Sequence, residues 1–204
     1  MNAEEFATLL VFAAAMSFTP GPNTMLATAL AANFGLRRTL PFVVAVPAGW
    51  TVMMLASGLG LGALVVALPW LRLLVKGIGV AYLVWLAWKL AGSRALASAA
   101  ASGLRIGFWQ GVGLQFVNVK AWMLALTLAA GWVTTSGGHA ASNPGERLGM
   151  ICAVMIAFAL ASNLAYALAG SLLRRWLAQG ARLLWFNRGM ALLLVATALW
   201  MLWA

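Results

Sequence analysis

Six long apolar runs constrain the fold of this chain more than any other feature. They cover roughly residues 4–34, 41–68, 70–91, 107–134, 148–172 and 185–204. Each is long enough to cross a bilayer core of about 30 Å. Only 8% of the residues are charged, which is too few to cover the surface of a soluble domain. The pattern therefore predicts an all-α integral membrane protein with six transmembrane helices.

The order of the runs predicts two halves. Three runs precede a small, basic segment at about 92–106, and three follow it. We interpret the chain as one transmembrane transporter domain, residues 1–204, made of two inverted three-helix repeats at about 1–91 and about 107–204, with that segment as the linker. The start of each half carries an irregularity at a matching place, which predicts that helices 1 and 4 are interrupted near the midplane. Paired interrupted helices of this kind form the binding site in many transporters.

Charge orients the predicted spans. Basic residues gather in the connections after the first, third and fifth runs, whereas the other side has only Arg72 and Arg147, with the acidic Glu4 and Glu5 at the N-terminus. The positive-inside rule then predicts that both chain termini lie outside the cytoplasm. The net charge of +10 does not indicate a nucleic-acid partner, because the basic residues are spread over short connections rather than gathered on one face.

The stretch "FTPGPNTML" at 18–26 interrupts the first run. Pro20 and Pro22 have no N–H, so the carbonyls of Met16 and Phe18 lose their helical partners. In lipid, such groups must be satisfied or must line a wet cavity. The helix that restarts after the prolines turns free N–H groups back toward the break. A site with donors and acceptors for a zwitterion is predicted, and a plain proline kink is the alternative. Its candidate substrate-binding residues are Pro20, Gly21, Pro22, Asn23 and Thr24.

Three polar residues in other runs are further candidates. Asn118 and Lys120 stand where the second half matches this break, since residues 116–129 can be laid on residues 18–31. Lys120 lies about 22 Å along a helix from Arg105, near the midplane, where a lysine is costly and usually functional. Lys76 lies about 9 Å past Trp70. The alternatives are a structural ion pair for Lys120, snorkelling for Lys76 and a helix–helix contact for Asn118.

Five segments resemble, in order, the motifs of the LysE/RhtB family of amino-acid exporters. They are "TPGPN" (19–23), "NFGLRRTLP" (33–41), "LLVKGIGVAYLVWLAWKL" (73–90), "FVNVKAW" (116–122) and "FNRGMALLL" (186–194). The resemblance implies efflux of amino acids or related small zwitterionic metabolites across the bacterial cytoplasmic (inner) membrane, driven by the proton motive force. No cofactor, metal or catalytic residue is predicted, and a homodimer is compatible with the resemblance.

The chain departs from the family pattern at two positions. Val119 replaces the proline of an Asn-Pro-Lys motif, so the second break is expected to be gentler than in relatives. Trp50 follows Gly49 where many relatives carry an acid, so no carboxylate is expected in the membrane core. The absence of an acid favours neutral or weakly polar substrates over basic ones.

The expected binding mode uses a lysine and the freed backbone. Lys120, with Lys76, is predicted to meet the substrate carboxylate, while the carbonyls of Met16 and Phe18, with Asn23 and Asn118, take the ammonium. A lysine removed from water gives up its proton more readily, so Lys120 is also the candidate for proton coupling. The alternatives are a non-transporting membrane scaffold or, less favoured with one His and no HExxH, an intramembrane enzyme.

Overall fold

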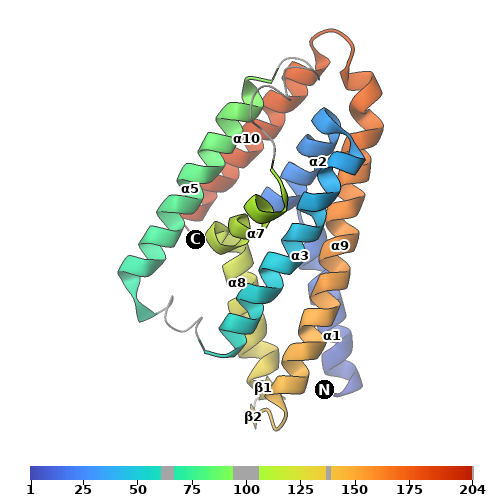
Figure 1. Ribbon diagram of the computed structural model, residues 1–204. Helices are drawn as coiled ribbons and strands as arrows, with labels where there is room; N and C mark the ends of the chain where they lie inside the picture. Colours follow the sequence, from blue (N-terminus) through green and yellow to red (C-terminus); the bar gives the residue numbers. More distant parts are fainter. Residues whose placement is uncertain (61–66, 94–105, 137–138, 204) are drawn as a thin grey trace.

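The computed structural model describes residues 1–60, 67–93, 106–136 and 139–203. The predicted linker at about 92–106 therefore lies largely outside the described residues, as does the end of the second predicted span. The elements, shown in Figure 1, are α1 (Ala3–Phe18), α2 (Pro22–Phe34), α3 (Leu36–Gly58), α5 (Pro69–Ala91), α7 (Phe108–Val117), α8 (Val119–Leu128), the π-helical turn η1 (Ala129–Val133), β1 (Thr135–Ser136), β2 (His139–Ala140), α9 (Pro144–Leu177) and α10 (Arg182–Trp203).

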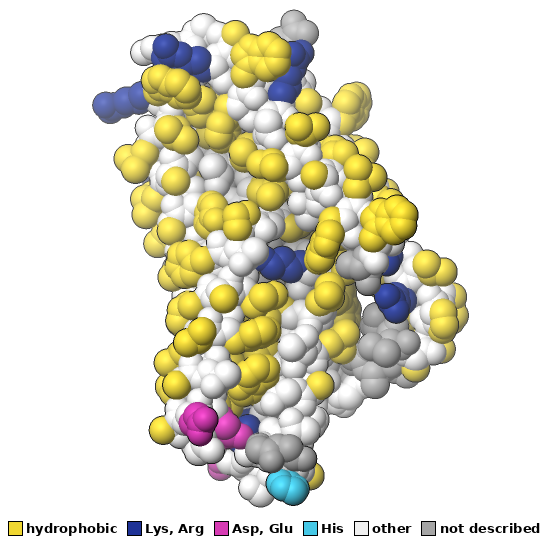
Figure 2. All heavy atoms as spheres, turned by 180° about the vertical axis from the view of Figure 1, so that it is seen from behind, with side chains coloured by type: hydrophobic (Ala, Val, Ile, Leu, Met, Phe, Trp, Pro, Cys, Tyr) yellow, Lys and Arg dark blue, Asp and Glu magenta, His cyan; other side chains and the backbone are white. Residues whose placement is uncertain are grey.

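The helices confirm an all-α membrane protein. By length and composition α3, α5, α9 and α10 can each cross a membrane, and α7 with α8 and η1 makes a fifth candidate if the bent pair is one span. Large apolar side chains such as Leu172 and Trp203 point outward, and Figure 2 shows apolar side chains along one whole face. α1 and α2 have 16 and 13 residues and are each too short to span alone. Six spans in two repeats remain a prediction.

Both predicted helix breaks are present. α1 ends at Phe18 and α2 begins at Pro22, while a single residue, Asn118, separates α7 from α8. The second break is sharp, because α7 and the helix from Val119 to Val133 are bent by 69°. It needs no proline. Asn118 has extended backbone angles and its Oδ1 accepts a hydrogen bond from the N–H of Lys120, so its own side chain caps the new helix.

Close helix crossings hold the two broken segments in the bundle. α9 runs along α2 and α3, α5 pairs with α10, and α7 crosses between α3 and α5 (Figure 1). Gly170 of α9 lies directly against the Thr28 carbonyl of α2, and Gly79 of α5 lies directly against the Val117 carbonyl at the end of α7. A Cβ at either glycine would collide with backbone, so these crossings depend on the missing side chain.

The core consists of two main apolar clusters. One is formed by α2, α3, α5, α7, α9 and α10, and the other by α1, α3, α8, η1 and α9. α3 contributes to both: Val46 belongs to the first cluster and Trp50, one turn later, to the second. The two helix breaks meet between these clusters, where the apolar packing is discontinuous.

The two ends of the bundle differ in charge. Figure 2 shows the acidic side chains and the histidine at one end and a group of Lys and Arg side chains at the opposite end. At the acidic end Arg147 was expected in a connection, but it lies in the first turn of α9 and is only 2% exposed. Its guanidinium contacts Glu5 of α1 at 3.2 Å and also donates to the carbonyls of Trp132 and Thr135. The burial follows from these partners, which neutralise and hydrogen-bond the charge.

Candidate functional site

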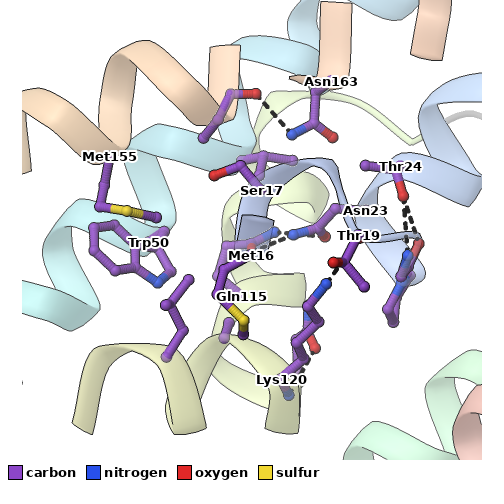
Figure 3. A pocket seen from close by; sticks show the side chains of 17 residues that line it. Met16, Ser17, Thr19, Asn23, Thr24, Trp50, Gln115, Lys120, Met155 and Asn163 are labelled. Atoms are coloured by element: carbon purple, nitrogen blue, oxygen red, sulfur yellow. Dashed lines mark hydrogen bonds between the residues drawn. The ribbon is translucent and has the colours of Figure 1, made fainter. Parts of the chain in front are cut away.

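A cavity of about 70 Å³ lies between the two helix breaks. Side chains from α1, α2, α3, α7, α8 and α9 line it, and Figure 3 shows the polar groups among them. A wider groove of about 550 Å³ lies on the α10 side of the first break, where Met25, Met123 and Trp200 form part of its wall. Lys120 and Gly21 line both spaces. The lysine therefore stands between a small cavity with several polar side chains and a wider, more apolar groove.

The "TPGPN" stretch wraps around Lys120. The Lys120 Nζ donates a hydrogen bond of 2.9 Å to the Thr19 carbonyl. Gly21 permits this approach, because a Cβ there would lie 3.3 Å from the Lys120 Cδ. The Gly21 N–H donates to the Thr24 Oγ1 at 3.0 Å, which fixes the turn into α2. The lysine is therefore hydrogen-bonded to the first break, although Lys120 and Thr19 are 101 residues apart.

A second link joins the breaks through two amides. The Asn23 Nδ2 donates to the Gln115 Oε1 at 2.9 Å, and the Gln115 Nε2 donates back to the Asn23 Oδ1 at 3.1 Å. Gln115 is fully buried and lies one turn before the break at Asn118. Sequence reasoning overlooked Gln115. Its position as an amide in an apolar run, next to a predicted interruption, is the signal that could have identified it.

Two carbonyls at the end of α1 are taken by α9, and one of them, that of Phe18, is among those freed by the prolines. The Ser162 Oγ donates to the Ser17 carbonyl at 2.6 Å, and the Tyr166 OH donates to the Phe18 carbonyl at 3.0 Å. Ser162 and Tyr166 are four residues apart and so share one face of α9. The expectation that the Phe18 carbonyl is free for a substrate ammonium is therefore wrong for this conformation, because a tyrosine hydroxyl occupies it.

Lys76 is not brought to this site. Its Nζ donates to the Leu202 carbonyl near the end of α10 at 3.1 Å, and Lys76 lines neither the cavity nor the groove. The other sequence-predicted residues meet at the cavity except Pro20, which lines only the groove. Asn118 lines the cavity while it caps α8, and Thr24, Asn23 and Lys120 line the same wall.

Two buried polar atoms on the cavity wall have no hydrogen-bond partner among the described residues. They are the indole Nε1 of Trp50, from α3, and the Oδ1 of Asn163, from α9. These residues are 5% and 4% exposed. An unpaired buried polar group is costly, and such groups concentrate where a ligand supplies the partner. The cavity therefore presents an ammonium, one free donor and one free acceptor. The described part of the chain holds no group of three or more His, Cys, Asp or Glu side chains suited to a metal ion.

Curated proteins similar to this chain share one name. The chain is 35% identical over 186 residues to a cysteine/O-acetylserine efflux protein of Salmonella typhimurium (strain LT2), with 89% of each chain covered. It is 34% identical over 189 residues to the protein of that name from Escherichia coli (strain K12), again with 89% of each covered. The Klebsiella pneumoniae protein of that name is 33% identical over 177 residues, with 86% of this chain and 87% of the relative covered.

No protein-family model and no solved structure matches the chain. The similarity to the curated relatives nevertheless extends over most of its length. Their shared name, efflux protein, agrees with the five motifs. The chain belongs to the LysE/RhtB family of amino-acid exporters.

Proposed function

We propose that this protein exports small neutral amino acids and that the cavity between the helix breaks binds them. The observation that carries the proposal is the junction itself: both interrupted helices meet at Lys120, beside a space lined by donors and acceptors. The similar proteins are named for efflux of cysteine and O-acetylserine, two small neutral amino acids. A volume of about 70 Å³ holds only a few water molecules, which suits a small substrate.

In the proposed binding mode the substrate carboxylate meets Lys120. The ammonium gives one hydrogen bond to the Thr19 carbonyl and keeps further N–H groups for a ligand. Asn163 takes the place of the Phe18 carbonyl as the acceptor for the substrate ammonium, because the Asn163 Oδ1 is unpaired whereas the Phe18 carbonyl is occupied. Asn23 and Gln115 hold each other and fix the shape of the wall.

We further propose that α1 and α2 together form the sixth span, which completes two inverted repeats that each start with an interrupted helix. Both termini would lie outside, with the end rich in Lys and Arg facing the cytoplasm. The separation of acidic and basic side chains in Figure 2 supports this orientation. The cavity is formed within one chain, and a homodimer is compatible with it.

Lys120 is also the proposed proton-coupling group. All three acids of the chain lie in the first turns of α1 and α9, so none reaches the cavity wall. A proton gradient drives efflux only when a proton moves inward as the substrate moves outward, so the Lys120 amine would take up a proton from the outside and release it to the cytoplasm in each cycle. This assignment predicts that efflux by the Lys120→Arg variant, which keeps a permanent charge, no longer responds to an imposed pH gradient.

A pair of matched variants tests the site. Purified protein in liposomes is assayed for transport of cysteine, O-acetylserine and a panel of other amino acids. Lys120→Met should abolish transport, while Lys76→Met, the same change at a lysine outside the cavity, should leave it near the wild-type rate. Full transport by Lys120→Met would remove the lysine from the mechanism. Absence of transport by the wild-type protein for every amino acid tested would favour a scaffold role.

A further inference from the structure

Trp50 presents the cavity with a hydrogen-bond donor that nothing in the described chain uses. It lies in α3 where the two apolar clusters meet, and its side chain is almost completely buried. The indole Nε1 has no partner and is enclosed, so bulk water does not satisfy it either. Figure 3 shows the nitrogen-bearing edge of the Trp50 ring turned toward Met16, at the cavity, rather than away from it. The unused donor therefore belongs to the cavity wall.

The Trp50 Nε1 is the one fully buried donor of the cavity wall that has no partner in the described chain. Gln115 and Asn23 satisfy each other, and the Thr24 hydroxyl donates to the Gly21 carbonyl. Lys120 is assigned to the substrate carboxylate in the proposed function. Those groups recognise the part that every amino acid has in common. A donor left over after the common part is bound can recognise only the part that differs, which is the substrate side chain.

The surroundings of Trp50 define the kind of side chain that fits. The nearby wall is apolar, with Val46, Leu124 and Met155 lining the same cavity. A pocket of this kind accepts an alkyl side chain weakly, but it leaves the indole N–H unpaired when it does so. A substrate with an oxygen acceptor removes that penalty, because a site built around a buried polar group discriminates against analogues that lack its partner.

We propose that Trp50 is a specificity-determining residue of the exporter. Its indole N–H donates a hydrogen bond to an oxygen acceptor in the substrate side chain, so the site prefers small amino acids with a hydroxyl, ester or amide oxygen over alkyl analogues of equal size. This inference rests on the proposed function, since it concerns the same cavity. It assigns a role to position 50, where the family resemblance leads us to expect an acid. Trp50 would act there as a neutral hydrogen-bond donor and not as a charged group.

The test compares serine with 2-aminobutyrate. The two amino acids are nearly equal in size, but 2-aminobutyrate has a methyl group where serine has its hydroxyl. Rates are measured for each compound with purified protein in liposomes. The wild-type protein should transport serine about five- to tenfold more efficiently, the effect expected of one hydrogen bond in a buried site. Trp50→Phe keeps an aromatic ring and removes the donor. It should bring the ratio close to one, mainly by slowing serine transport, with 2-aminobutyrate transport retained.

Two further variants separate recognition from folding. Trp88→Phe makes the same change at a tryptophan of α5 that is 73% exposed, and it should keep the wild-type ratio. Trp50→His restores a ring N–H and should recover part of the preference for serine. An unchanged ratio in Trp50→Phe, or an equal loss of both substrates, would overturn the role of Trp50. Equal transport of the two compounds by the wild-type protein would overturn it without any variant. Transport of neither by the wild type would instead count against the proposed function.

Discussion

The two helix breaks solve the same backbone problem in different ways. At the first break, three carbonyls at and just after the end of α1 accept hydrogen bonds from side chains of other helices: Ser162 and Tyr166 of α9 and Lys120 of α8. At the second break the residues that interrupt the helix also repair it. Asn118 caps α8, and the Trp122 indole N–H donates to the Phe116 carbonyl at 2.7 Å.

This difference shows why the first break is better suited to bind a ligand. At a break whose backbone groups are hydrogen-bonded by side chains of the same turn, a ligand cannot easily take over those hydrogen bonds. It would have to displace a side chain that is held in place by the chain itself. A break whose partners come from other helices can exchange them when those helices move. The Thr19 carbonyl and the Lys120 ammonium are such a pair. We expect the first break to depend on distant donors and the second on local capping and packing.

Replacement of Gly79 by alanine should have the largest effect. A Cβ there meets the Val117 carbonyl, immediately before the second break, and a backbone atom cannot move aside as a flexible side chain can. We expect Gly79→Ala to lower the free energy of unfolding by about 3 kcal/mol, as overpacking does. The measurement is denaturant unfolding in detergent micelles. Gly113→Ala, at a glycine of α7 with no neighbour within 4 Å, should be neutral or slightly stabilising. Equal losses would mean that the α5–α7 crossing is not tight.

Removal of a distant donor at the first break comes next. Ser162→Ala leaves the buried Ser17 carbonyl without its hydroxyl partner, which should lower the free energy of unfolding by about 2 kcal/mol. Ser171→Ala, nine residues further along α9, should change it by less than about 0.5 kcal/mol. If the two variants behave alike, the first break does not need a donor from α9.

Removal of the local cap at the second break should cost less. Asn118→Ala loses the hydrogen bond from the Lys120 N–H, and an N-cap of this kind contributes about 1 kcal/mol. Asn118→Ser, which retains a capping oxygen, should recover most of the loss in the same unfolding assay. A larger loss for Asn118→Ala than for Ser162→Ala would reverse the comparison between the breaks.

The sequence predicted both breaks, and their causes are local. Proline lacks an N–H wherever it occurs, so the first interruption follows from a few neighbouring residues. The second was predicted from the match of residues 116–129 to residues 18–31, and Asn118 produces it by capping α8. The donors from α9 did not follow, because they depend on which face of a distant helix meets the break. Gln115 was missed for the same reason. Its importance comes from Asn23, which is 92 residues away.

Lys76 and Lys120 also show that contacts with distant helices could not be predicted from the sequence. Both are lysines within apolar runs, and the sequence placed them at different depths but assigned both to the substrate carboxylate. The packing separates them, since Lys120 turns to the first break and Lys76 to the end of α10. Trp50 was noted only as the absence of an acid. Its unpaired N–H became visible once the cavity wall was complete.

The smallest expected effect concerns the far end of α1, away from its break. The Ser136 hydroxyl and the Arg147 guanidinium, together with other hydrogen bonds, lower the pKa of Glu5 from 4.5 to about 2. A carboxyl group with a depressed pKa contributes its full stability above its unfolded value, and that contribution is lost as the pH falls from about 4.5 toward 2. The melting temperature in detergent should therefore decline over this range in the wild type. The decline should be weaker in Glu5→Gln and unchanged in Glu146→Gln, since Glu146 lies outside this network. A Glu5→Gln profile identical to that of the wild type would mean that α1 is held by its break alone, without the contact between Glu5 and Arg147.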